Sequence, residues 1–65
     1  MRLRKRTLCK VRQQRSLSLT DLAHKSTIAR STIHRIEKGQ SPHPQTRRLL
    51  AQALMISVQS IDWPE

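Results

Sequence analysis

The chain has 65 residues, and 13 Lys and Arg against 4 Asp and Glu give it a formal net charge of +9. This length fits one small domain, which buries only about 60% of the surface that its unfolded chain exposes. Hydrophobic residues make up 35%, with one Trp and no Phe or Tyr, so the core must be aliphatic. The charge predicts attraction to a polyanion, which is DNA, RNA or an anionic membrane.

Two of these polyanions fit the sequence poorly. A membrane-surface helix needs a continuous apolar face, and here the apolar residues form short clusters separated by polar turns. No apolar run approaches the roughly 20 residues of a membrane span. The lack of Phe and Tyr counts against single-stranded RNA, whose recognition depends on aromatic stacking. We therefore expect no membrane partner, and a nucleic acid other than single-stranded RNA fits the charge best.

The expected compartment follows from the cysteine count and from the N-terminus. Cys9 is the single cysteine, so it forms no intrachain disulfide and fits a reducing environment. The basic start, residues 1–6, leads to no apolar stretch of the signal-peptide kind. We expect a cytoplasmic protein that is associated with the nucleoid through DNA.

The scarcity of Gly and Pro predicts an all-α chain. A first helix is expected over residues 5–15. A second helix begins after Ser18, whose side chain can accept from the N–H of Asp21 while that carboxylate reaches back, as in a capping box. This helix runs to about Lys25.

A third helix is expected over residues 30–38, with Ile33 and Ile36 on its buried face. Gly39 follows where a left-handed C-terminal cap is needed. Pro44 suits the first turn of a fourth helix, because its missing N–H is not needed there.

Ser57 is expected to cap a short fifth helix. The prediction is thus a compact five-helix bundle with a central helix-turn-helix. We divide the chain into a basic arm at residues 1–6, a DNA-binding domain at 7–62 and a short tail at 63–65.

The most informative segment is residues 18–39, which reads as helix, turn, helix. In a helix-turn-helix, the N-terminal part of the second helix meets base edges in the major groove while the first helix crosses the backbone. Arginine can donate two hydrogen bonds to guanine, and Ser or His can reach one edge atom. The predicted base contacts are the polar residues on the exposed face of this second helix, Arg30, Ser31, His34 and Arg35.

At these residues the sequence resembles the Cro/repressor-type (XRE-like) helix-turn-helix family. The likeness covers residues 8–61, and it is strongest at Leu22-Ala23, residues 30–33, residues 35–39, Ala51 and Ala53-Leu54. The resemblance implies a lambda-repressor-like fold, binding to double-stranded DNA as a dimer, and a role in transcriptional regulation, for which we expect a repressor.

The resemblance also implies roles for single residues. Lys38, His43 and Gln45 match positions that contact the DNA backbone in the family. To these expected backbone contacts we add Ser18, which precedes the second helix, and Lys25, near its end. Arg12 and Glu37 match a structural ion pair between the first and third helices.

The dimer region of the family falls on the end of this chain. Val58, Gln59 and Ile61 match it, and Trp63 is expected to extend it as a large apolar anchor. Because so short a last helix buries little area, we expect a homodimer that is weak in solution and firm on DNA.

The chain departs from the family at several positions. Glycines of the family are replaced by Ser16, Thr27 and Met55. A left-handed backbone at Thr27 or Met55 costs about 1–2 kcal/mol, so we expect those turns to relax into another geometry. Ala29 removes a helix cap, at a cost of about 1 kcal/mol. Leu19 replaces a polar residue that contacts phosphate, and Arg47 replaces an apolar one. Either the fourth helix is rotated or this arginine extends its charge outward.

Other functions were weighed against the same residues. Cys9, His24, His34 and His43 have no spacing typical of a structural zinc site, so no metal and no other cofactor is expected. Ser31 and His34 lie three residues apart, but no acid is placed to orient the His, so no enzyme is expected.

Three further readings stay open. The basic start, with Arg2, Arg4, Lys5 and Arg6, is either an arm in a DNA groove or a solvated tail. An antitoxin-like or adaptor protein, whose main partner is another protein, is the first alternative function. An RNA-associated basic protein is the second.

Overall fold

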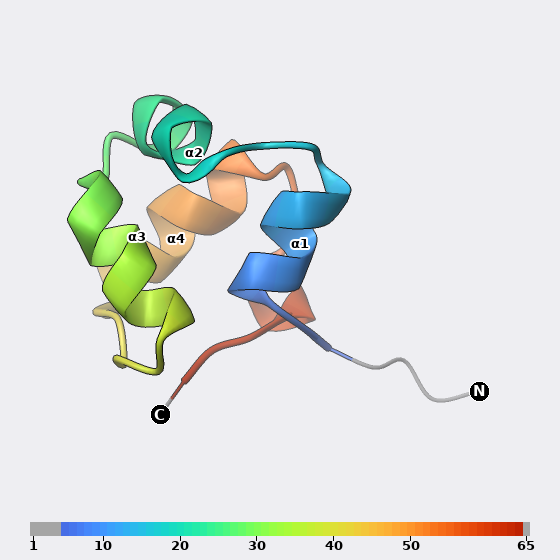
Figure 1. The fold of residues 1–65 in the computed structure, drawn as a ribbon. Helices are drawn as coiled ribbons and strands as arrows, with labels where there is room; N and C mark the ends of the chain where they lie inside the picture. Colours follow the sequence, from blue (N-terminus) through green and yellow to red (C-terminus); the bar gives the residue numbers. More distant parts are fainter. Residues whose placement is uncertain (1–4, 65) are drawn as a thin grey trace.

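The computed structural model describes residues 5–64, in which four α-helices surround a shared core (Figure 1). The helices are α1 (Leu8–Gln14), α2 (Leu19–Ser26), α3 (Arg30–Glu37) and α4 (Pro44–Ala53). A single turn of 3-10 helix, η1 (Val58–Ser60), follows α4. Two short strands flank these elements, β1 (Arg6–Thr7) before α1 and β2 (Ile61–Asp62) after η1. The mostly helical prediction is correct, but the expected fifth helix is only this three-residue turn, and the Ser57 side chain makes no capping hydrogen bond.

The first helix begins later than predicted, at Leu8 instead of Lys5. Thr7 caps it, because its Oγ1 accepts from the backbone N–H of Lys10 at 3.2 Å. The two residues before the helix, Arg6 and Thr7, pair in parallel with β2. This pairing joins the two ends of the domain, so Arg6 is part of the folded unit and does not belong to the predicted arm. Arg2 and Arg4 lie outside the described residues.

The start of α2 is built as predicted. The backbone N–H of Asp21 donates to Ser18 Oγ at 3.0 Å, and the backbone N–H of Ser18 donates to Asp21 Oδ2 at 3.0 Å. The capping box is therefore confirmed. The hydrogen bond from the backbone N–H of Ser18 to the carboxylate, followed by the effect of the Ser18 side chain, holds the pKa of the Asp21 carboxyl below its ordinary value.

The core is aliphatic except for one ring. Its buried members are Leu8, Val11, Leu22, Ile33, Ile36, Leu50, Ala51, Leu54, Ile61 and Trp63. Trp63 is only 7% exposed, and its Nε1 donates to the backbone oxygen of Val58 at 3.0 Å. Trp63, the first residue of the predicted tail, is thus part of the core.

Two contacts explain how α4 accommodates the charge of Arg47 near the Trp63 ring. Its guanidinium carbon lies 5.9 Å from the centroid of the Trp63 ring, within the range of a cation–π contact. Its Nε donates to the backbone oxygen of Pro42 at 3.3 Å. The expected buried residues Leu50 and Leu54 remain inside, so the helix is not rotated, and the half-buried arginine is held by these contacts.

The turns that replace glycines stay left-handed, contrary to our expectation. The φ angles are +58° at Ser16, +61° at Thr27 and +58° at Met55. After α1 and α4 the reason is a closing hydrogen bond between residues five apart. Leu17 N–H donates to Arg12 O, and Ile56 N–H donates to Ala51 O, each at 3.1 Å.

Such a bond requires a left-handed residue before its donor. Gly39, with φ of +120°, ends α3 in the same way, because Gln40 N–H donates to Arg35 O at 3.0 Å.

Candidate nucleic-acid interface

The helix-turn-helix unit consists of α2, the turn at residues 27–29, and α3, which lies at one edge of the molecule (Figure 1). Buried Ser26 fixes the turn. Its Oγ donates to Leu22 O at 2.7 Å and accepts from Ile28 N–H at 3.2 Å. Ala29 provides no side-chain cap to α3, as the sequence indicated.

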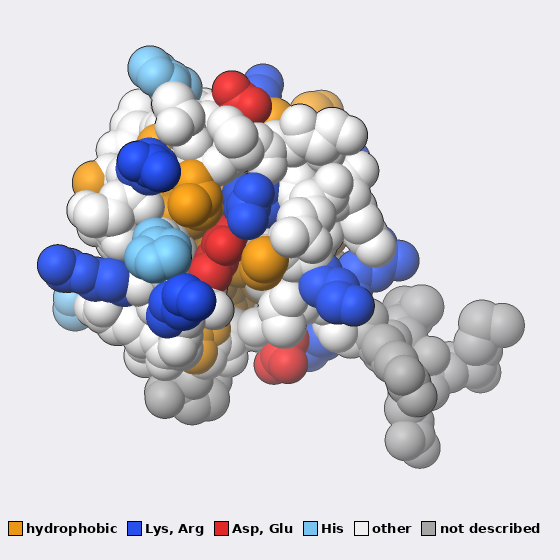
Figure 2. All heavy atoms as spheres, viewed as in Figure 1, with side chains coloured by type: hydrophobic (Ala, Val, Ile, Leu, Met, Phe, Trp, Pro, Cys, Tyr) orange, Lys and Arg blue, Asp and Glu red, His pale blue; other side chains and the backbone are white. Residues whose placement is uncertain are grey.

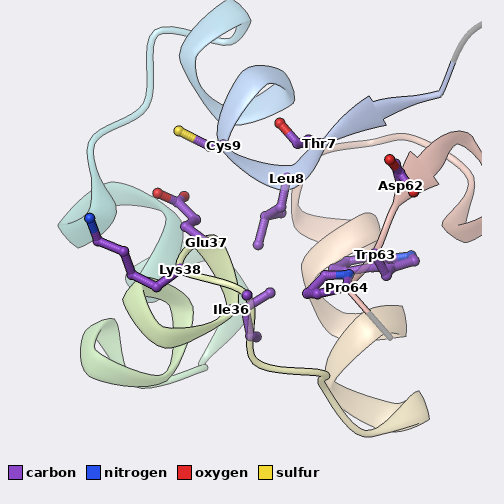
Figure 3. A pocket seen from close by; sticks show the side chains of 10 residues that line it. Thr7, Leu8, Cys9, Ile36, Glu37, Lys38, Asp62, Trp63 and Pro64 are labelled. Carbon is purple, nitrogen blue, oxygen red and sulfur yellow. The ribbon is translucent and has the colours of Figure 1, made fainter.

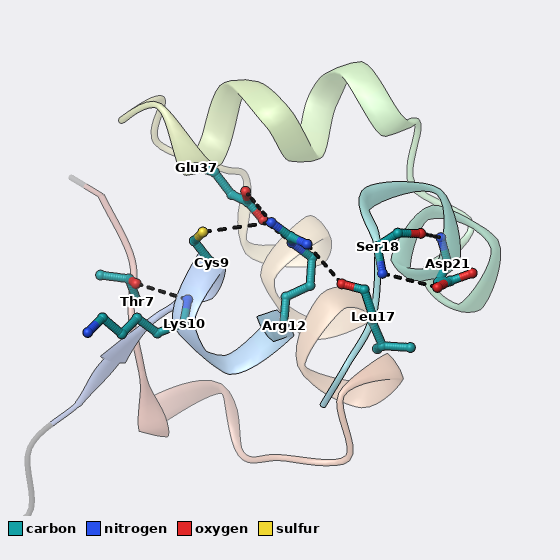
Figure 4. Close-up of polar contacts among 8 residues, drawn as sticks. All are labelled: Thr7, Cys9, Lys10, Arg12, Leu17, Ser18, Asp21 and Glu37. Atoms are coloured by element: carbon teal, nitrogen blue, oxygen red, sulfur yellow. Dashed lines mark hydrogen bonds and ion pairs between the residues drawn. The ribbon is translucent and has the colours of Figure 1, made fainter. Parts of the chain in front are cut away.

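The inner side of α3 is fixed to the rest of the domain. Ile33 and Ile36 are buried in the core. At the C-terminal end, Glu37 accepts from Arg12 twice, with Nε–Oε2 at 2.7 Å and Nη2–Oε1 at 3.1 Å (Figure 4). The two side chains are only 13% (Arg12) and 9% (Glu37) exposed. The predicted ion pair is therefore present, and it connects α1 to α3.

Arg12 also organises the neighbouring loop. Its Nη1 donates to the backbone oxygen of Leu17 at 2.8 Å, and its Nη2 approaches Cys9 Sγ at 3.7 Å (Figure 4). The hydrogen bond to Glu37, opposed by burial, raises the pKa of Arg12 above its ordinary value. The guanidinium is thus a fixed positive charge that neutralises the Glu37 carboxylate at the C-terminal end of α3.

The outer side of α3 is exposed and carries polar side chains without partners. All four predicted base-contact residues lie there, namely Arg30, Ser31, His34 and Arg35. Within residues 5–64, none of these side chains makes a hydrogen bond or an ion pair to another part of the chain. In Figure 2, basic and histidine side chains gather over α3. The structure therefore brings the predicted reading residues together on one side of one helix.

A hollow of about 590 Å³ opens on this side between the start of α2 and α3. It is lined by Leu19, Arg30, Ser31 and His34. The sequence predicts Leu19 as an inward-facing residue and as a position without the usual phosphate contact, but not as a part of the site. Its place directly after the cap of α2, opposite the first turn of α3, is the signal that could have put it in the site.

The predicted backbone contacts lie on several elements. Ser18 caps α2, Lys25 lies in its last turn, Lys38 follows α3, and His43 and Gln45 stand at the start of α4. All five are exposed. They stay predictions, because DNA is not present.

The predicted dimer patch needs a correction. The side chains of Ile61 and Trp63 are 1% and 7% exposed, because both fill the core of their own chain. Trp63 is thus unavailable as an apolar anchor. Val58 is half-buried and Gln59 is exposed. Met55, three residues before Val58, is 86% exposed. Among the described residues it is the large apolar side chain with the greatest exposure.

A second cavity of about 450 Å³ lies between the start of α1, the end of α3 and the C-terminal segment (Figure 3). Cys9, Ile36, Glu37 and Trp63 are among its lining residues. Over residues 5–64, no three His, Cys, Asp or Glu side chains come together as a metal site. In the same range, no helix has the length and apolar character to cross a bilayer.

The comparison with protein families agrees with this geometry. A family model described as helix-turn-helix matches residues 10–61, which covers α2, the turn, α3 and α4 and most of the chain. No match was found among curated proteins or among solved structures. The family is one of DNA-binding regulatory domains and not one of enzymes. The chain therefore belongs to the XRE-type family of helix-turn-helix DNA-binding regulators.

Proposed function

We propose that the protein is a sequence-specific transcriptional repressor that reads the major groove of double-stranded DNA with α3. The observation that carries the proposal is which side chains of α3 have contacts within the domain and which have none among the described residues. Those on the inner side are buried or ion-paired, whereas Arg30, Ser31, His34 and Arg35 are exposed and have no partner within residues 5–64. An α-helix fits the major groove, where each base pair presents a distinct pattern of donors and acceptors.

The side chains have separate roles in this proposal. Arg30 and Arg35 each donate two hydrogen bonds to guanine O6 and N7, and Ser31 and His34 each contact one edge atom. The backbone contacts come from the exposed residues around α3, namely Ser18, Lys25, Lys38, His43 and Gln45. These contacts hold the domain in register on the duplex and carry no sequence information themselves.

The protein binds as a symmetric dimer that is weak in solution. Since Ile61 and Trp63 are internal, the dimer patch consists of Met55, Val58 and Gln59. In a two-fold dimer the same patch meets itself, so a small apolar surface is sufficient. Met55 supports this assignment, because its large apolar side chain is 86% exposed, which brings no benefit to the isolated domain.

Selection of bound sequences from a random duplex library tests the function. We expect an enriched site with dyad symmetry and with guanines in each half-site. Failure to enrich any sequence above the starting pool contradicts the proposal. A reporter gene with this site placed over its promoter then tests repression. We expect lower expression of the reporter when the protein is present.

The same site tests the dimer. Two recognition helices of a dimer lie about one duplex turn apart, roughly 34 Å. Inserting half a turn between the half-sites should abolish tight binding, and Met55→Asp should weaken it on the unaltered site. Equal affinity with the insertion contradicts a rigid dimer. No feature of the described residues favours the antitoxin-like, adaptor or RNA-associated alternatives.

A further inference from the structure

The hollow beside α3 has one apolar wall and several polar ones. Arg30, Ser31 and His34 line it from α3, and Leu19 lines it from the first position of α2. Leu19 is half-buried and packs against the core, so its position is fixed while part of its surface remains open. It places an apolar side chain among side chains that otherwise donate or accept hydrogen bonds.

The chemistry of the base edges limits what fits against this wall. In the major groove, guanine, adenine and cytosine present polar edge atoms, whereas thymine presents a C5-methyl group beside its O4 acceptor. A polar edge atom pressed against Leu19 loses its water without gaining a hydrogen bond, which is unfavourable. Thymine avoids this penalty, because its methyl group can contact the leucine while Ser31 donates to O4.

A phosphate is a poorer occupant for the same reason. The position of Leu19 offers no side-chain donor, and a charged oxygen beside an apolar side chain is not compensated. Arg30 supplies the charge that draws the polyanion to this side, and Leu19 adds a preference among the bases that it meets.

We propose that Leu19 is a specificity-determining residue, which receives the C5-methyl group of one thymine in each half-site. This proposal rests on the proposed function, because it needs α3 in the major groove. It adds an α2 residue to the reading surface and names the base that this residue selects.

Replacement of thymine by deoxyuridine tests the proposal, because it removes the methyl group and keeps O4 and the base pairing. Each thymine of the selected site is replaced singly, and the dissociation constant is measured by fluorescence anisotropy. We expect one position per half-site at which the change weakens binding about fourfold, the value for one buried methyl-sized group. Replacement in both half-sites should weaken it about fifteenfold.

Variants then connect this effect to Leu19. Leu19→Ala should bind the thymine and deoxyuridine sites equally, whereas Leu19→Met should keep the difference. Thr20→Ala is the matched control, because Thr20 is exposed in the same turn and does not line this hollow. It should leave the fourfold difference unchanged. If Leu19→Ala does not fold, as judged by circular dichroism, Leu19→Gln takes its place and should also be indifferent to the methyl group.

Two outcomes overturn the proposal. One is a selected site where no thymine replacement changes the affinity, and the other is a difference that persists in the folded Leu19→Ala or Leu19→Gln protein. Both are distinguishable from failure of the proposed function, since they require that the wild-type protein binds a selected site.

Discussion

The two sides of α3 are built in opposite ways, although the helix has only eight residues. On the inner side, Ile33 and Ile36 fill the core, and Glu37 accepts two hydrogen bonds from Arg12. On the outer side, the polar side chains are exposed and have no partners within residues 5–64. If α3 reads DNA as proposed, stability and recognition depend on separate sets of residues. Substitutions on one side should leave the property of the other side largely unchanged.

The outer side should produce the largest effect, through salt. Four exposed cations in or directly after α2 and α3 bring positive charge close to the phosphates, the two base-reading arginines included, namely Lys25, Arg30, Arg35 and Lys38. About eight neutralised phosphates per dimer give a log–log slope near −7, so affinity should fall about 10⁴-fold between roughly 50 and 200 mM salt. Titrations at several salt concentrations measure this slope. Affinity that is insensitive to salt contradicts the electrostatic role of this side.

The inner side should produce the largest effect on folding, through Glu37→Ala. This change leaves the guanidinium of Arg12 without its partner at a site where both side chains are nearly buried. The free energy of unfolding should fall by about 3 kcal/mol, the lower end for a buried pair broken on one side. Thermal unfolding measures it, with Lys38→Ala, an exposed neighbour, as a control that changes stability by under about 0.5 kcal/mol.

An unchanged melting temperature for Glu37→Ala shows that the pair contributes nothing. A variant that stays folded but prefers a different base contradicts the separation between the two sides of α3.

The capping box of α2 should have a smaller effect, which is confined to stability. Ser18→Ala removes the acceptor for the Asp21 N–H and should cost about 1 kcal/mol. Because the pKa of Asp21 is lowered in the folded state, its contribution is complete above its ordinary pKa and is lost as the pH falls through the lower folded value. The stability difference between wild type and Asp21→Asn should therefore shrink in acid. A difference independent of pH contradicts this role.

The turn between the two helices should have the smallest effect, and in the stabilising direction. Thr27 holds φ at +61°, and Thr27→Gly relieves about 1–2 kcal/mol of strain while it adds up to about 1 kcal/mol of unfolded-state entropy. We expect a net gain of about 0.5–1 kcal/mol with unchanged base preference. Thr20→Gly, inside α2, is the control and should destabilise the protein. A less stable Thr27→Gly protein contradicts the strain at this turn.

Local signals in the sequence predicted most of the helix-turn-helix. The capping box at Ser18 and Asp21, the spacing of Ile33 and Ile36, and the position of Gly39 each depend on residues a few positions apart. Such interactions can be read from neighbouring letters. The Arg12–Glu37 pair spans 25 residues and was available only through the family resemblance.

The ends of the chain were predicted poorly because their structure depends on distant contacts. Arg6 and Thr7 form a strand only by pairing with residues 61 and 62, and no local pattern indicates it. Trp63 was assigned to a dimer, whereas its ring fills the core and its Nε1 donates to Val58. Likewise, Leu19 enters the site only because the turn folds α2 against α3. A residue's spatial neighbours, and not its type, decided these cases.

The central claim is that the outer side of α3 reads the base sequence, and Arg35→Ala tests it most directly. The dissociation constants of wild type, Arg35→Ala and Lys38→Ala are measured on the selected site and on sites with single base changes. Arg35→Ala should lose discrimination at one base pair per half-site, by about 1–3 kcal/mol, while its melting temperature is unchanged. Lys38→Ala should weaken binding to all sequences alike. If Arg35→Ala also lowers the affinity uniformly, α3 does not read the sequence through this residue, and the account is wrong.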